Sequence, residues 1–183
     1  MNANTPEYWN QQWHSGVKKF PLYTMNMIKR LVPKEASVLD IGCGNGKFLR
    51  KLIEEKNCKC FGIDISEVAI DEMRNAGIDG IVTSAENLDS IEGEFDIVTA
   101  SHIFEHIDND EGLMRNIARL TKQFAIITVP NDCSYPEETG EHVRKYNLDS
   151  LRELALRYFE SVIDHTRRNR ELLKFHLILQ CFK

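Results

Sequence analysis

Short apolar runs alternate with amphipathic helical patterns along most of this chain. The run at 38–41 has one acid among apolar residues and predicts a buried strand. Four similar runs predict further strands, at 59–65, 80–83, 95–100 and 124–129. Apolar residues at helical spacing predict the intervening helices, at 47–56, 66–75 and 110–120. This alternation of strand and helix predicts a mostly parallel sheet with helices on both faces.

The last part of the chain has a different pattern. An amphipathic helix is predicted at 148–159, and two apolar stretches follow at 161–165 and 175–182. Two strands joined by so short a polar segment pair antiparallel, because a parallel connection needs a dozen or more residues. The predicted fold class is therefore α/β. It is a single doubly wound domain with a mostly parallel seven-stranded sheet that ends in a C-terminal antiparallel hairpin.

Three glycines stand at alternate positions directly after the first predicted strand. Gly42, Gly44 and Gly46 allow a tight turn, and they let a ligand approach the backbone where a Cβ would collide. The helix that begins at Lys47 offers free N–H groups, which can receive a carboxylate or a hydroxyl. This order of strand, turn and helix is typical of a site for an adenosine-containing cofactor.

The spacing of these glycines separates two cofactor classes. A dinucleotide site reads G-x-G-x-x-G, but here the third glycine comes one residue early and Lys47 holds the expected position. The segment V-L-D-I-G-C-G-N-G at 38–46 resembles the first motif of the class I S-adenosylmethionine-dependent methyltransferases, V-L-D-x-G-x-G-x-G. The resemblance implies a Rossmann-like methyltransferase fold with an antiparallel hairpin at one edge, and S-adenosyl-L-methionine as the cofactor.

An acid at the end of the second predicted strand is a further candidate for cofactor binding. Asp64 stands 22 positions after Gly42, where a carboxylate can accept hydrogen bonds from both ribose hydroxyls. The resemblance implies that Asp40 orients the ammonium end of the cofactor, and that Ala85 and Glu86 belong to the loop facing the adenine. The predicted cofactor-binding residues are Asp40, Gly42, Cys43, Gly44, Gly46, Asp64, Ile65, Ala85, Glu86, Ala100 and Ser101.

The fourth predicted strand leads into a segment with two histidines. Residues 95–107 read F-D-I-V-T-A-S-H-I-F-E-H-I, which is similar to the F-D-x-V-x-x-x-x-x-L-E-H-V pattern of the ubiquinone-biosynthesis O-methyltransferase group. Methyl transfer depends mainly on alignment and on exclusion of water, and a base is needed only when the acceptor must lose a proton. We predict His106 and His142 as the candidate catalytic residues for that step.

Two other interpretations of these polar residues stay open. Four of them together could hold a divalent ion: His102, Glu105, His106 and His142. Some ubiquinone-type and RNA-end methyltransferases bind such an ion with an E-x-x-E-H segment plus later histidines. Here His102 replaces the first acid of that segment, so no metal is predicted. The same side chains could instead be structural, or could simply line the pocket.

Two segments outside the predicted sheet are candidate covers for the pocket. The segment 8–13 holds both tryptophans, and in many relatives of the resembled family a similar segment folds over the cofactor. An amphipathic helix packed on the sheet is the alternative. The chain is accordingly divided into an N-terminal helical lid segment, 1–36, and a methyltransferase domain, 37–183. The long loop at 130–146 is predicted to cap the substrate.

Composition and charge narrow the function classes. With 183 residues, 42% of them hydrophobic and 28% charged, the chain fits one ordinary globular domain. A net charge of −5 argues against a general nucleic-acid binder. No apolar run is long enough to cross a bilayer and no signal-peptide pattern is visible, so we expect a cytoplasmic protein without a membrane partner. The five cysteines, an odd number, argue against a disulfide framework.

The predicted function is methyl transfer from S-adenosyl-L-methionine to a small-molecule acceptor, at oxygen. Two rival functions are weighed against it. An NAD-dependent oxidoreductase shares the fold class and the acid at Asp64, but its fingerprint fails at the third glycine. A non-catalytic domain that only binds S-adenosylmethionine would keep the same pocket, because the residues of the resembled family serve mostly for binding.

Overall fold

The computed structural model describes residues 4–16, 22–131, 142–166 and 176–183. The helices of this part are α1 (Pro6–His14), α2 (Leu22–Leu31), α3 (Lys47–Lys56), α4 (Glu67–Asn75), the 3₁₀ turn η1 (Phe104–His106), α5 (Asp110–Leu120) and α6 (Leu148–Leu156). Its strands are β1 (Ser37–Ile41), β2 (Lys59–Asp64), β3 (Asp79–Val82), β4 (Phe95–Ser101), β5 (Thr121–Pro130), β6 (Ser161–Asp164) and β7 (His176–Phe182). Most of the predicted substrate cap, 132–141, lies outside the described residues.

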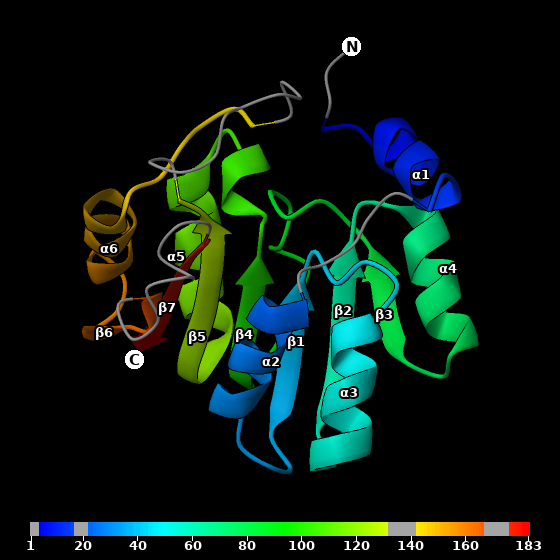
Figure 1. The fold of residues 1–183 in the computed structure, drawn as a ribbon, viewed down its shortest axis with the longest axis horizontal. Coiled ribbons are helices and arrows are strands. Elements are labelled where there is room, and N and C mark those ends of the chain that lie inside the picture. Colours follow the sequence, from blue (N-terminus) through cyan, green and yellow to red (C-terminus); the bar gives the residue numbers. More distant parts are fainter. Residues whose placement is uncertain (1–3, 17–21, 132–141, 167–175) are drawn as a thin grey trace.

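The strands form one seven-stranded sheet in the order β3-β2-β1-β4-β5-β7-β6 (Figure 1). All neighbours from β3 to β5 pair parallel, whereas β7 runs antiparallel to both β5 and β6. This arrangement confirms the predicted α/β fold, the mostly parallel sheet and the C-terminal antiparallel hairpin. The chain builds outward in one direction from β1 to β3 and in the other direction from β4, so the topological switch point lies between β1 and β4.

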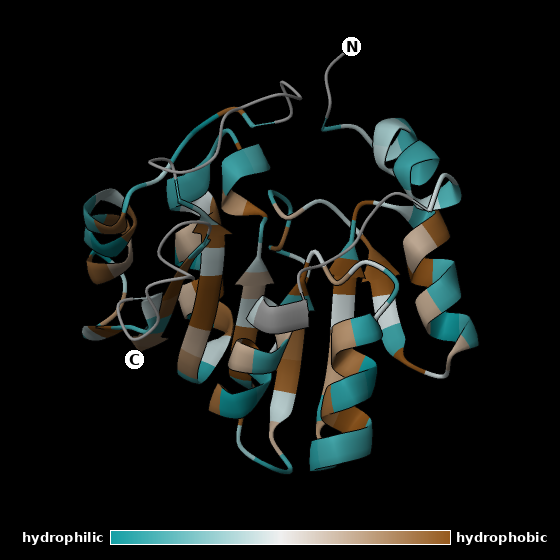
Figure 2. Cartoon of the chain, in the orientation of Figure 1, coloured by the Kyte–Doolittle hydropathy of each residue, from teal (hydrophilic) through white to brown (hydrophobic). Residues whose placement is uncertain are grey.

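Alternating side chains of the strands supply two separate cores. In β1, Val38 packs with α2, α3 and α4, whereas the next residue, Leu39, packs with α5 and α6 on the opposite face. Ile97 and Val98 of β4 divide in the same way. Because helices cover both faces, the central strands are apolar along much of their length, and Figure 2 shows long brown stretches in β1 and β5.

The predicted element boundaries agree with the structure to within a few residues at most ends. Helix α6 is an exception, because it ends at Leu156 rather than at 159. The N–H groups of Tyr158 and Phe159 both donate to the Ala155 carbonyl oxygen, which closes the helix in a tight turn. Phe159 is still buried in the core, so its side chain extended the apolar helical pattern beyond the helix itself.

The cysteines and the lengths of the helices bear on two expectations, namely the absence of a disulfide framework and of a membrane span. The cysteines within the described residues are free, namely Cys43, Cys58, Cys60 and Cys181, and Cys133 lies outside that part. No helix in the described ranges combines the length and the apolar character that crossing a bilayer would require.

Candidate functional site

A cavity of about 840 Å³ opens at the carboxyl ends of β1, β2 and β4. Open parallel sheets place ligands at this edge, beside the topological switch point, and β1 and β4 flank that point here. The volume lies in the range of cofactor and small-molecule sites. The lining includes the glycine turn, α1, η1 and three residues from later in the chain, Pro130, His142 and His176.

The glycine turn after β1 is tied to the neighbouring strand. The N–H groups of Gly42 and Cys43 both donate to the Ile63 carbonyl oxygen, at 2.8 and 3.0 Å. Gly44 has a φ of +53°, a conformation that L side chains rarely adopt. A Cβ at Gly44 would also lie 2.4 Å from Cζ2 of Trp13. The turn therefore needs glycine at this position for its conformation and for its close neighbour.

Most of the predicted cofactor residues line this one cavity: Asp40, Gly42, Cys43, Gly44, Asp64, Ile65, Ala85, Glu86 and Ser101. The Cys43 thiol among them is unreactive. Burial, together with the charges of Asp40 and Asp64, raises the pKa of Cys43. The Cys43 thiol is therefore neutral at physiological pH and acts as a small apolar wall.

Two predicted cofactor residues, Gly46 and Ala100, are not among the residues of the described part that line the cavity. Gly46 has a φ of +72°, and a Cβ there would lie 2.4 Å from Cγ of Met73, so this glycine lets α3 begin close to α4. Ala100 is buried within β4, one residue before the lining Ser101. The structure thus gives both residues a place in the packing that supports the turn.

The Asp64 carboxylate joins the ends of three elements. Its Oδ2 accepts a hydrogen bond from the Gly44 N–H, and its Oδ1 accepts one from the Ser66 N–H, both at 2.9 Å. Ser66 is the N-cap of α4, and its Oγ accepts from the Ala69 N–H at 3.2 Å. Asp64 therefore fixes the glycine turn to the start of α4 while it also faces the cavity.

Asp40 is a buried carboxyl group at the floor of the cavity, only 5% exposed. The Thr99 hydroxyl donates to its Oδ1 at 2.6 Å. Burial raises the pKa of Asp40 to about 7, against the opposing effect of the Thr99 hydrogen bond and with a further rise from the charge of Asp64. This carboxyl consequently changes its charge near neutral pH, and a cation in the cavity would favour the ionised form.

Four histidines line another part of the same cavity, namely His102, His106, His142 and His176. His102 directly follows β4 and has a φ of +57°, which is uncommon for a residue with a side chain. Its N–H donates to the Thr128 carbonyl oxygen at 2.9 Å, which continues the pairing of β4 with β5. This left-handed residue turns the chain from the strand into η1, so the polar side chains of 102–106 face one another.

Glu105 is the acid of this histidine group and is 2% exposed. Its Oε1 lies 3.2 Å from Nδ1 of His102 and 4.0 Å from Nε2 of His106. Burial raises the pKa of Glu105, but the hydrogen bond and charge of His102, with the charge of His106, outweigh it and hold the pKa below its usual range. The ring of His142 stands 5.0 Å from that of His106. The four predicted polar residues are therefore brought together.

His176 belongs to the same group and was not predicted. It is the first residue of β7, and its ring centroid lies 4.8 Å from that of His102. Burial and the neighbouring His102 lower the pKa of His176 to about 4, against a smaller opposing effect of Glu105. The signal was present in the topology: an antiparallel strand starts at the edge where its parallel neighbours end.

Helix α1 touches both parts of the lining. Trp13 packs on the glycine turn at Gly44, and the ring of Trp9 stands 5.3 Å from that of His106 in an edge-to-face contact. Between them, the Asn10 carboxamide oxygen accepts hydrogen bonds of 2.7 and 3.3 Å at the N-terminus of α4. The predicted aromatic segment 8–13 therefore lies over the cavity rim, next to α4 (Figure 1).

Comparison with known proteins identifies the family of this chain. The family described as a methyltransferase domain matches residues 18–158 of the chain. The ubiquinone biosynthesis O-methyltransferase of Coxiella burnetii is 28% identical over 122 residues, which cover 60% of this chain and 52% of that protein. The protein of the same name from Xanthomonas oryzae pv. oryzae is 28% identical over 126 residues, covering 62% and 52%. The chain thus spans about half the length of these curated relatives.

Solved structures share the architecture. Magnesium protoporphyrin IX methyltransferase from Synechocystis PCC 6803, with bound SAM, has a TM-score of 0.73 at 15% identity and covers 97% of this chain and 94% of its own. A SAM dependent methyltransferase from Archaeoglobus fulgidus has a TM-score of 0.70 at 20% identity, with 88% and 94% covered. At such identities the likeness is one of fold.

Proposed function

This chain belongs to the methyltransferase-domain family, whose cofactor is S-adenosyl-L-methionine, and we propose that it transfers the methyl group to a hydroxyl oxygen of a small molecule. One observation carries the proposal: a single cavity joins a glycine turn flanked by two carboxyl groups to a group of four histidines. The first part suits a cationic nucleoside, and the second suits an acceptor that must lose a proton. The names of the curated relatives support transfer to oxygen.

The residues around the glycine turn fit S-adenosyl-L-methionine by their chemistry. We assign the ribose hydroxyls to Asp64, because this carboxylate lines the cavity beside the glycine turn and a carboxylate accepts hydrogen bonds from hydroxyl groups. We assign the ammonium group to Asp40, whose ionised form a cation favours. Gly44 keeps the turn in its left-handed conformation beside Trp13, and we assign Ala85 and Glu86 to the adenine side.

The chain itself supplies alignment, exclusion of water and a place for a proton. When bound, the cofactor provides a methyl group on a positively charged sulfur, which an acceptor oxygen attacks in line. Trp9 and Trp13 of α1 cover the cavity and limit the access of water. His106 or His142, whose rings are 5.0 Å apart, accepts the hydroxyl proton as a neutral imidazole.

One observation favours a second version of the acceptor chemistry. Ligand atoms of Glu105, His106 and His142 lie within 4.8 Å of one another, close enough to share a divalent cation. In that version the three residues would hold the ion, which would bind and orient the acceptor hydroxyl, and a chelator would abolish transfer. In the base version a chelator leaves the rate unchanged.

Labelled-methyl transfer tests the proposal. The protein is first titrated calorimetrically with S-adenosylhomocysteine and with NAD, and we expect binding of the former alone because Lys47 stands where a dinucleotide site needs glycine. Transfer from labelled S-adenosyl-L-methionine is then measured to a catechol, a primary amine and a carboxylate, with and without a chelator. We expect the catechol to react fastest. Transfer to the amine alone contradicts a hydroxyl acceptor, and binding without any transfer supports the non-catalytic rival.

A further inference from the structure

Exposure alternates along the segment 142–146, which lies shortly before α6. Val143 and Lys145 are exposed, whereas His142 and Arg144 are half-buried and Tyr146 is only 5% exposed. The three less exposed side chains are thus His142, which lines the cavity, and Arg144 and Tyr146, which follow it at alternate positions.

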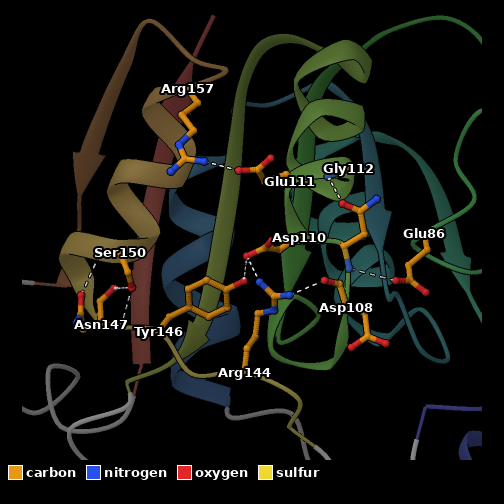
Figure 3. Close-up of polar contacts among 11 residues, drawn as sticks. Glu86, Asp108, Asp110, Glu111, Gly112, Arg144, Tyr146, Asn147, Ser150 and Arg157 are labelled. Carbon is orange, nitrogen blue, oxygen red and sulfur yellow. Dashed lines mark hydrogen bonds and ion pairs between the residues drawn. The ribbon is translucent and has the colours of Figure 1, made fainter.

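One carboxylate holds both of those inward neighbours (Figure 3). The Tyr146 hydroxyl donates to Oδ2 of Asp110 at 2.7 Å, and the Arg144 guanidinium forms an ion pair with the same oxygen. Arg144 also donates to the Asp108 carbonyl oxygen. Asp110 is the first residue of α5, whose N-cap Asn109 accepts from the Gly112 N–H at 2.9 Å. The segment is thus attached to the fixed end of a helix.

The backbone of the segment is tied to η1 at the same time. The N–H groups of Val143 and Arg144 donate to the Glu105 carbonyl oxygen at 2.9 and 3.4 Å. These bonds immediately follow His142, whose ring stands 5.0 Å from that of His106. The ring of Tyr146 also packs edge-to-face against Phe104 of η1, at 6.3 Å. Contacts on α5 and on η1 therefore set where the His142 ring lies.

We propose that Asp110, Arg144 and Tyr146 are positioning residues for methyl transfer: they hold His142 against His106 at the acceptor end of the cavity. The inference rests on the proposed function, because it assigns His142 a part in handling the acceptor. We call Asp110, Arg144 and Tyr146 the clamp. None of them is among the described residues that line the cavity, so the clamp acts through the segment 142–146 and not on the acceptor. Loss of the shared carboxylate leaves the Arg144 charge and the buried Tyr146 hydroxyl without their common partner, so the segment keeps its backbone bonds to η1 but loses its attachment to the Asp110 side chain.

A matched control lies one residue further along the same helix. Glu111 of α5 forms an ion pair with Arg157, which directly follows α6, and both side chains are about half exposed, at 56% and 52%. Figure 3 shows this pair apart from the Asp110 contacts. Glu111→Gln therefore makes the same chemical change as Asp110→Asn on the same helix, but it removes no contact of the segment 142–146.

The experiment compares Asp110→Asn with Glu111→Gln in the full chain. Misplacement of a reacting group by about 1 Å can cost up to about 100-fold, so we expect Asp110→Asn to lower kcat by about 10- to 100-fold for the acceptor that reacts fastest. The calorimetric affinity for S-adenosylhomocysteine should stay within about twofold, since the clamp does not touch the glycine turn. Tyr146→Phe, which removes one hydrogen bond and keeps the ring, should give a smaller loss of the same kind. Glu111→Gln should behave like the unmodified protein.

A double substitution separates positioning from general weakening. If the clamp acts through His142, adding Asp110→Asn to His142→Ala lowers kcat no further than His142→Ala alone. A further independent loss of about 10-fold or more in the double variant overturns the proposal. An unchanged kcat in Asp110→Asn overturns it as well.

Amide hydrogen exchange gives a readout that does not depend on turnover. Asp110→Asn should speed exchange of the Val143 and Arg144 amides, and Glu111→Gln should not. Unchanged exchange in Asp110→Asn refutes the clamp whatever the activity. If exchange responds as expected but the unmodified protein transfers no methyl group to any acceptor, the clamp exists and the proposed function is what fails.

Discussion

The two parts of the cavity are built in different ways. The glycine part comes from one strand, turn and helix start plus the end of β2, and its contacts join neighbouring strands that are parallel and regular. The histidine part draws on η1, the segment 142–146, the first residue of β7 and helix α1. The first part is fixed by local geometry, whereas the second exists only when four distant stretches of chain meet. Binding and acceptor chemistry should therefore respond to substitution separately.

The largest effect is expected at the glycine turn. Gly44→Val should abolish binding of S-adenosylhomocysteine. A valine there would have to adopt a φ of +53°, and its side chain would displace Trp13, which lines the same cavity. Calorimetry measures the affinity, and circular dichroism checks that the fold remains. Gly77→Val is the control: its φ is +80° but no atom lies within 4 Å of its added Cβ, so it has the strain without the filled space. If Gly44→Val binds S-adenosylhomocysteine as tightly as Gly77→Val does, the glycine turn is not part of the cofactor site.

The histidine part should respond in turnover and not in cofactor affinity. Replacing the general base, His106 or His142, with Ala should lower kcat by about 10²–10⁴-fold. Affinity for S-adenosylhomocysteine should change little, because neither residue contacts the glycine turn or Asp64 in the contacts described above. If both variants keep kcat within a few-fold of the unmodified protein, no imidazole serves as the base and alignment alone carries the transfer.

Asp64 connects ligand binding with the stability of the glycine part. Asp64→Ala should weaken cofactor binding by about 1.5–3 kcal/mol, the range for hydrogen bonds to a charged partner. It should also lower the Tm, because the Gly44 and Ser66 N–H groups lose their acceptor. Ser66→Ala provides the comparison: it removes the cap of α4 and should cost about 1 kcal/mol of stability without a matching loss of affinity. A lower Tm with unchanged affinity in Asp64→Ala would leave Asp64 a structural role only.

The smallest expected effect is a pH dependence at Asp40. Its pKa of about 7 means that the carboxyl is protonated in mild acid and cannot attract an ammonium group. Affinity for S-adenosylhomocysteine should therefore rise from pH 6 to pH 8, by about tenfold or less, and Asp40→Asn should flatten the curve. The stability of the fold should change with pH in the opposite direction to the cofactor affinity. A carboxyl whose pKa is raised from 3.8 to about 7 by folding makes the cofactor-free protein less stable as the pH rises across that interval.

The difference between the two parts also explains what the sequence could reveal. The run 38–46 encodes strand, turn and helix start in consecutive letters, and the apolar runs mark the remaining strands because helices cover both faces of the sheet. Gly46 shows the limit of that reasoning, since its spacing does not reveal that a Cβ there would collide with Met73 of α4. Local pattern fixes backbone conformation, but it does not say which neighbour fills the space.

The histidine part was only partly predictable for a physical reason. His102, Glu105 and His106 are close in sequence, so their proximity follows from one turn of chain. His176 and the anchoring of Arg144 and Tyr146 on Asp110 depend on contacts between residues more than thirty positions apart. No local spacing encodes such contacts, and they emerge only from the order and direction of the strands.

The reversed direction of β7 has a consequence for the growing polypeptide. Strand β5 is ten residues long, is buried over most of its length, and pairs with β4 on one side and with β7 on the other. While the ribosome has made the chain only to β5, that second edge has no partner and presents an apolar row of free N–H and C=O groups. A nascent chain at this stage is prone to edge-to-edge association. Synthesis of β7 therefore both covers the second edge of β5 and supplies His176 to the pocket wall.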